Sequence, residues 1–159
     1  GLVLGTGGCA TRRNTVVYTD SPISQRSPSS IRNSNAALNW PLPSPIKMSR
    51  GFQASLGKPH EGIDLPAPRG TKIFAAKRGK VIYSGQAFHG YGRMILIAHD
   101  NEIATLYAHC SKIFVKAGDN VTGRQVIGLV GQTGRATAPH LHFEVRKQRT
   151  PVDPMEFLP

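Results

Sequence analysis

The sequence predicts an all-β domain, and three observations support this fold class. After Trp40, short apolar or alternating runs recur along the chain. Gly, Pro, Asn and Asp separate these runs, which is typical of strands joined by turns. No segment has the apolar periodicity of a helix of about ten residues or more. We therefore expect β-strands to build the folded part of the chain.

The first nine residues resemble the clipped end of a lipoprotein signal peptide. Apolar and small residues lead from Gly1 to Cys9, and in such signals a cysteine in this position becomes lipidated. The usual Leu three places before the cysteine is replaced by Thr6. We interpret residues 1–9 as a signal remnant and Cys9 as a lipid anchor to a membrane surface. The alternative is a flexible end with an incidental thiol.

Residues 10–39 are predicted to be a disordered tether, because Ser, Asn, Arg and Pro dominate and apolar residues are sparse. A tether behind a lipidated cysteine favours the periplasm, and Ala10 after Cys9 is compatible with anchoring to the outer membrane. Secretion by another route is the alternative.

Residues 40–159 form the predicted domain. Between two of its runs, His99-Asp100-Asn101-Glu102 indicates a hairpin turn, because Asp and Asn tolerate left-handed backbone. The runs that we expect to be strands are Lys72–Ala75, Gly79–Tyr83, Met94–Ile97, Ile103–Tyr107, Val126–Val130 and Leu141–Val145.

The composition restricts the partners. A chain of 159 residues suffices for one domain with a core, and its net charge of +11 favours an anionic partner. We expect no nucleic acid, because no Cys/His finger spacing and no phosphate-binding loop is present and aromatic residues make up only 7%. No apolar run reaches the roughly 18 residues of a membrane-spanning helix.

Histidines and one aspartate are spaced as in a metal site. His140 and His142 lie two apart in a predicted strand, so both side chains emerge on one face. His60 and Asp64 lie in a loop that enters a strand, and His109 ends another strand. The alternative is that these are ordinary surface or core histidines.

The residue types suit catalytic zinc. Such zinc takes three protein ligands from His, Asp or Glu and leaves the fourth position to water. Two histidines and Asp64 would satisfy this number, and bound zinc lowers the pKa of its water to about 7. The remaining histidines would then handle protons.

Several spaced segments after Trp40 together carry a resemblance to a known family. They are His60-Glu61-Gly62-Ile63-Asp64-Leu65, Gly90-Tyr91-Gly92, Tyr107-Ala108-His109, Gly118-Asp119-Asn120-Val121, Ile127 to Gly134, and Pro139-His140-Leu141-His142-Phe143-Glu144. With these segments the chain from Trp40 onward resembles the lysostaphin-type (LytM-type) metallopeptidase domain. The resemblance implies an antiparallel β-sheet sandwich or half-barrel, one zinc ion, and peptidoglycan as substrate. It assigns His60, Asp64 and His142 as zinc ligands and His109 and His140 as catalytic residues.

Several neighbouring residues stay open. Ala138 and Cys110 stand where the family usually has Gly and Leu, and the usual Ser after Arg135 is missing. We expect Cys110 to be a buried small residue rather than a fourth ligand, because its side chain should point away from that of His109. Glu144 could orient a histidine or form a structural ion pair. Tyr91 and Tyr107 are candidates for substrate contact.

The resemblance implies a zinc metalloendopeptidase that hydrolyses amide bonds in the stem or cross-link peptides of peptidoglycan. The main alternative is a LytM-type regulator that activates cell-wall amidases during division, with amidase or divisome proteins as partners. Because all five site residues are present, the sequence favours the enzyme. A binding module with structural zinc is weaker, since structural sites usually have four Cys or His ligands.

Overall fold

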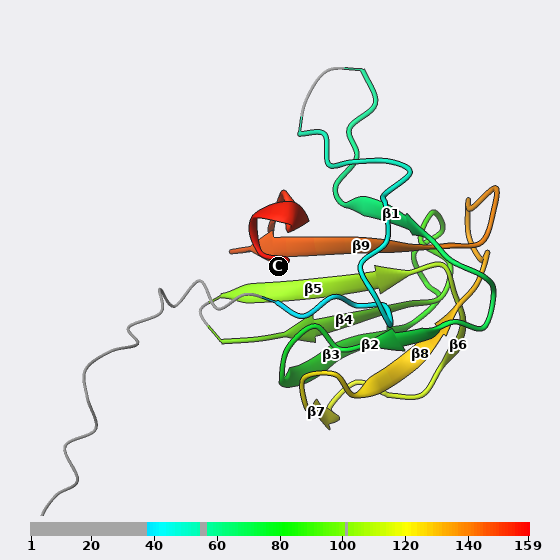
Figure 1. Ribbon diagram of the computed structural model, residues 1–159. Coiled ribbons are helices and arrows are strands. Elements are labelled where there is room, and N and C mark those ends of the chain that lie inside the picture. Colours follow the sequence, from blue (N-terminus) through cyan, green and yellow to red (C-terminus); the bar gives the residue numbers. More distant parts are fainter. Residues whose placement is uncertain (1–37, 55–56, 101) are drawn as a thin grey trace, which may run out of the picture. The chain divides into compact units, whose positions relative to one another are not determined.

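The computed structural model describes residues 38–54, 57–100 and 102–159, which form two antiparallel β-sheets (Figure 1). The description therefore concerns the part of the chain from Leu38 onward. Cys9 and residues 10–37 of the expected tether lie outside the described residues. In the described part, no helix is long and apolar enough to cross a membrane.

The larger sheet has seven strands in the order β1-β9-β5-β4-β3-β7, and β10 pairs with β9. Strands β3, β4 and β5 form a meander, whereas β9 comes from late in the chain and inserts between β1 and β5. These strands are β1 (Ile63–Pro66), β3 (Gly79–Gly85), β4 (Met94–Ala98), β5 (Ile103–Ala108), β7 (Asn120–Val121), β9 (His140–Lys147) and β10 (Thr150–Val152).

The smaller sheet has the order β2-β8-β6, formed by β2 (Lys72–Phe74), β8 (Val126–Val130) and β6 (Cys110–Ile113). Only His109 separates β5 from β6, and its φ of 62° lies in the left-handed region. The chain thus passes from one sheet to the other at a site residue. The 3₁₀ helix η1 (Pro154–Glu156) is the only helical element in the described ranges.

One hydrophobic core joins the two sheets. The fully buried side chains of Ile95 and Ile97 on β4 pack in the same cluster as those of Ile127 and Val130 on β8. Leu38 and Leu42 join this cluster, and Leu38 N–H donates a hydrogen bond to Phe157 O (2.7 Å). The folded part therefore includes Leu38 and Asn39, two residues before the expected start at Trp40.

Strand β9 carries the core on one face and the site on the other. Leu141, Phe143 and Val145 are fully buried in the core cluster. The alternating residues His140 and His142 emerge on the opposite face, as the period of two requires. Because β1 and β5 flank β9, residues from three strands meet beside these two histidines.

The predicted all-β fold class is confirmed, and each of the six predicted runs overlaps a strand. The predicted hairpin joins β4 to β5, where His99 N–H donates to Ile103 O (2.8 Å) and Glu102 has a φ of 60°. Strands β6, β7 and β10 fall outside the predicted runs. They are short; β6 and β7 lie at sheet edges, and β10 pairs with β9 across the turn that follows it.

Candidate metal centre

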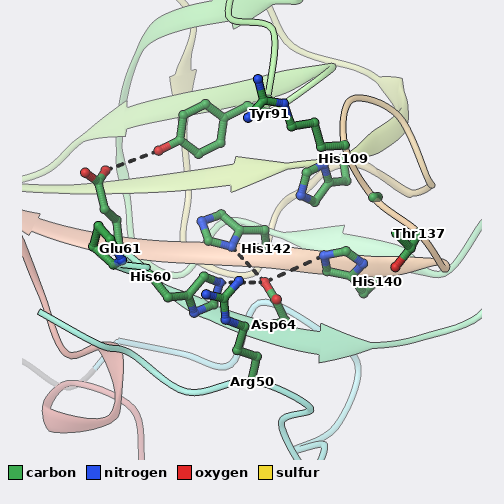
Figure 2. Close-up of a pocket in the computed structure, with 13 residues that line it drawn as sticks. Arg50, His60, Glu61, Asp64, Tyr91, His109, Thr137, His140 and His142 are labelled. Atoms are coloured by element: carbon green, nitrogen blue, oxygen red, sulfur yellow. Dashed lines mark hydrogen bonds and ion pairs between the residues drawn. The ribbon is translucent and has the colours of Figure 1, made fainter. Parts of the chain in front are cut away.

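Three candidate ligands converge where β1 lies beside β9 (Figure 2). Asp64 on β1 lies opposite His142 in the antiparallel register, and His60 precedes β1 in a bridge with Gln53. Asp64 Oδ1 lies 2.8 Å from His142 Nδ1 and 3.1 Å from His60 Nε2. The three ligand atoms all lie within 4.8 Å of one another, so the structure brings the predicted ligand set together.

A main-chain carbonyl orients His60. Its Nδ1 lies 2.7 Å from Gly51 O, and a carbonyl can only accept, so Nδ1 carries a proton and Nε2 is the nitrogen that can ligate a metal. The segment that supplies this carbonyl is tied to β1, because Asp64 N–H donates to Arg50 O (2.9 Å). The short bridge between residues 50–53 and 60–64 therefore sets the direction of one ligand.

A buried carboxylate orients His142. Glu144 is fully buried, and its Oε1 lies 3.0 Å from His142 Nε2 and 2.7 Å from the Tyr91 hydroxyl. Its Oε2 accepts from Arg146 Nε at 2.7 Å, and Arg146 Nη2 binds Glu61 at 2.6 Å. Since the carboxylate accepts from Nε2–H, Nδ1 of His142 is the nitrogen that can ligate a metal. Glu144 thus has both functions that the sequence left open.

A positive charge stabilises this cluster of acceptor atoms. Although burial opposes it, hydrogen bonds with Asp64 and Glu144 raise the pKa of His142 to about 9. The pKa of Asp64 is lowered in spite of burial, chiefly by the hydrogen bond with His142. Two imidazole nitrogens and one carboxylate oxygen form the donor set of a catalytic zinc site, so these residues fit a zinc ion.

Two further histidines, His109 and His140, lie beside the three candidate ligands, and each has one ring nitrogen without a main-chain partner among the residues that the structure describes. His109 Nδ1 donates to Thr133 O (2.7 Å) and His140 Nδ1 to Ala138 O (2.8 Å), which leaves both Nε2 atoms for chemistry. The two ring centroids lie 4.7 Å apart. Burial lowers the pKa of His109 to about 4, so this ring is neutral at pH 7.

Two loops must approach closely to hold His109 in place. Gly92 and Gly134 both have positive φ, 64° and 71°. A Cβ on Gly134 would overlap Gly90 O and Gly92 N, so a side chain has no space there. The contact fixes Thr133, whose carbonyl orients His109 and whose Oγ1 donates to the Cys110 carbonyl at 2.9 Å.

The site opens to solvent through a cavity of about 530 Å³. Tyr91 lines it, with the hydroxyl bound to Glu144 and to Glu61 at 3.2 Å. The full lining is Arg50, Pro59, His60, Glu61, Asp64, Gly90, Tyr91, His109, Arg135, Ala136, Thr137, His140 and His142. All five predicted metal and catalytic residues therefore share one cavity.

Tyr107 does not line this cavity. Its side chain is fully buried, and its hydroxyl accepts from Ala76 N–H at 2.8 Å and from Thr105 Oγ1 at 2.9 Å. Its partners in register on the flanking strands are the core residues Ile95 and Phe143. Tyr107 is thus a core residue, which corrects the sequence interpretation. Cys110 is also fully buried, as expected.

Two kinds of residue that build the site are absent from the sequence predictions. The first kind comprises Arg146, which forms an ion pair with Glu144, and Glu61, which forms an ion pair with Arg146. The alternation from His140 through Glu144 could have revealed Arg146, because it lies on the same face of the strand. The carbonyls of Gly51, Thr133 and Ala138 leave no signal in side-chain identity. Such acceptors become visible only when the backbone path is known.

Comparison with known proteins gives a family for this chain. Peptidase family M23 matches residues 58–154, which contain all five predicted site residues. The DD-carboxypeptidase/endopeptidase Mpg of Neisseria meningitidis is 48% identical over 96 residues, which cover 60% of this chain and 22% of that protein. The uncharacterized lipoprotein YgeR of Escherichia coli is 39% identical over 120 residues, 76% of this chain and 47% of YgeR.

Murein hydrolase activator NlpD of Salmonella typhimurium is 33% identical over 147 residues, 91% of this chain and 38% of NlpD. The chain therefore spans less than half the length of these three relatives.

Solved structures of peptidases resemble this chain in fold. A zinc-containing peptidase from Vibrio cholerae superposes with a TM-score of 0.71 at 37% identity, over 77% of this chain and 41% of that one. Lysostaphin from Staphylococcus simulans gives 0.64 at 36% identity, over 71% and 49%. The chain belongs to peptidase family M23, with the lysostaphin-type fold.

Proposed function

We propose that this protein is a zinc metalloendopeptidase that hydrolyses amide bonds in the stem or cross-link peptides of peptidoglycan. One observation carries the proposal: His60 Nε2, Asp64 Oδ1 and His142 Nδ1 converge beside two histidines whose Nε2 atoms face the same open cavity. A structural metal site would not need two extra proton carriers or such an opening. The arrangement therefore supports catalysis.

His60, Asp64 and His142 would hold the zinc ion. When bound, zinc polarises the amide carbonyl and lowers the pKa of a water molecule to about 7. The carbonyl of Gly51 and the carboxylate of Glu144 keep the two imidazoles in the tautomers that ligation needs.

His109 and His140 would handle the proton and the developing charge. His109 is neutral because burial lowers its pKa, so its Nε2 can accept a proton from the attacking water. His140 Nε2 lies 3.6 Å from Asp64 Oδ1, beside the metal ligands, where the ring would stabilise the oxyanion or return a proton to the leaving amine. Both rings are oriented by main-chain carbonyls, so neither has to be ordered during the reaction.

The substrate class is supported by relatives and by charge. Mpg is named a DD-carboxypeptidase/endopeptidase, and lysostaphin an antimicrobial peptidase. The net charge of +11 suits an anionic cell-wall polymer. We also propose a location in the periplasm, with a lipid anchor on Cys9 to the outer membrane, since YgeR is named a lipoprotein. Incorporation of labelled palmitate that Cys9→Ser abolishes would test the anchor.

Digestion of purified peptidoglycan by the zinc-loaded protein tests the enzymatic proposal. Fragments are identified by mass spectrometry, with His142→Ala as the inactive variant and His89→Ala as the matched control, because His89 is an exposed histidine outside the cavity. Cleavage of a peptide bond that requires zinc and His142 supports the proposal. Intact peptidoglycan from several wall types, with zinc bound, would refute it.

Activation of a cell-wall amidase is the second candidate function, favoured by the similarity to NlpD along 91% of this chain. The same digestion is repeated with a purified amidase of the cell envelope. An activator releases stem peptides from the glycan only together with the amidase, and His142→Ala would leave that release unchanged. Cleavage of a peptide bond in peptidoglycan without added amidase would instead identify the protein as a peptidase.

A further inference from the structure

Two arginines line the metal cavity without an acidic partner. Arg50 and Arg135 are exposed, and among the described residues neither forms an ion pair. The acidic groups of the cavity are already engaged, since Glu61 binds Arg146 and Asp64 faces the site histidines. The cavity therefore offers two unneutralised guanidinium groups to a ligand.

Arg50 is held on the side of the metal ligands. Figure 2 shows it beside Asp64 and His60, across from Tyr91 and His109. Its carbonyl accepts from Asp64 N–H (2.9 Å), and the next residue along the chain carries the carbonyl that orients His60. The backbone that presents Arg50 is thus part of the frame of the site.

Arg135 is held on the opposite wall. Its N–H donates to Gly90 O (3.0 Å), in the loop that contains Tyr91. It follows Gly134 and lies two residues after Thr133, whose carbonyl orients His109. Each arginine therefore projects from backbone that also orients a site histidine, so the backbone position of each arginine is set relative to the site.

Guanidinium groups bind carboxylates through paired, charge-assisted hydrogen bonds. We infer that Arg50 and Arg135 each bind a carboxylate of the substrate peptide, one on each side of the amide that is cut. This inference rests on the proposed peptidase function and names its substrate class: an anionic stem or cross-link peptide rather than an uncharged oligoglycine bridge. The two arginines would be specificity-determining residues.

The test uses synthetic cross-linked stem peptides in four forms, with the carboxylates beside the scissile amide free, amidated on one side, amidated on the other, or amidated on both. The zinc-loaded wild type, Arg50→Gln and Arg135→Gln are compared by kcat/KM. Arg69→Gln is the matched control, because Arg69 is an exposed arginine outside the cavity.

We expect each cavity variant to lose about threefold to tenfold in kcat/KM on peptides that carry its own carboxylate. The loss should fall below about twofold when that carboxylate is amidated, as a direct coupling between the two groups requires. Arg69→Gln should behave like the wild type on all four peptides. Equal losses on charged and amidated peptides, or no loss in either variant, would overturn the inference.

Failure of the proposed function would look different. If the zinc-loaded wild type cuts none of the peptides, the peptidase proposal fails, and the same set is then compared by fluorescence anisotropy of labelled peptides. Tighter binding of the carboxylate forms that Arg50→Gln and Arg135→Gln abolish would support carboxylate recognition without catalysis. Equal affinity for charged and amidated peptides would overturn it.

Discussion

Gly134→Ala tests whether the close contact of two loops holds the catalytic cavity together. An alanine at a φ of 71° costs about 1–2 kcal/mol, because its Cβ crowds the neighbouring carbonyl. The added Cβ would also overlap Gly90 O and Gly92 N, and such overpacking costs about 1–3 kcal/mol. The expected loss in the free energy of unfolding is therefore about 2–5 kcal/mol.

Gly118→Ala is the matched control for this prediction. Gly118 has a φ of 98°, but no neighbouring atom lies within 4 Å of the place that a Cβ would take, so only the backbone cost of about 1–2 kcal/mol applies. Urea unfolding of both variants, followed by the fluorescence of the single Trp, measures the difference. Equal destabilisation of the two variants would refute the packing argument, as would a Gly134→Ala protein as stable as the wild type.

Three further predictions concern the buried groups. Glu144→Gln should weaken zinc binding about tenfold to hundredfold, measured by competition with a chelator at pH 9.5, because it removes the carboxylate that orients His142; unchanged affinity would contradict this role. After treatment with chelator, the protein should lose on the order of 3 kcal/mol of stability between pH 6.5 and 9. The folded state keeps His142 protonated up to its raised pKa of about 9, whereas the unfolded state releases the proton near 6.5, so urea unfolding at both pH values checks the loss and a flat profile opposes it. Burial raises the pKa of the Cys110 thiol to about 12, so in a Cys9→Ser background Ellman's reagent should label Cys110 only after unfolding; fast labelling of the folded protein would count against its burial.

Strand β9 shows how far sequence reasoning could reach. Its alternation predicts that His140 and His142 share a face, because a period of two follows from backbone geometry alone. The pairing of β9 with β1 brings Asp64 to the same place, and this requires the register between strands that lie 78 residues apart in sequence. Only the resemblance to a known family supplied that long-range information in advance.

The interpretation of Tyr107 failed for a related reason. Tyr107 lies two residues before the site residue His109 in the sequence, and it was predicted as a candidate for substrate contact. The left-handed backbone of His109 turns the chain into the second sheet at this point, so sequence neighbours face different surroundings. Tyr107 packs between Ile95 and Phe143 in register, and nothing in its local sequence reports that pairing.

Main-chain carbonyls orient three of the site histidines, so these hydrogen bonds do not depend directly on which side chain stands at the acceptor position. Any residue that keeps the local backbone path supplies the same oxygen, so Ala138 can replace the family's usual Gly without loss of the acceptor for His140. The residues at positions 51 and 138 can vary while the reaction is retained. A saturation mutagenesis scan would then find tolerance at residues 51 and 138 wherever side chains fit. It would find intolerance at Thr133, whose Oγ1 also donates to the Cys110 carbonyl, and at Gly134, where the backbone path itself depends on the residue.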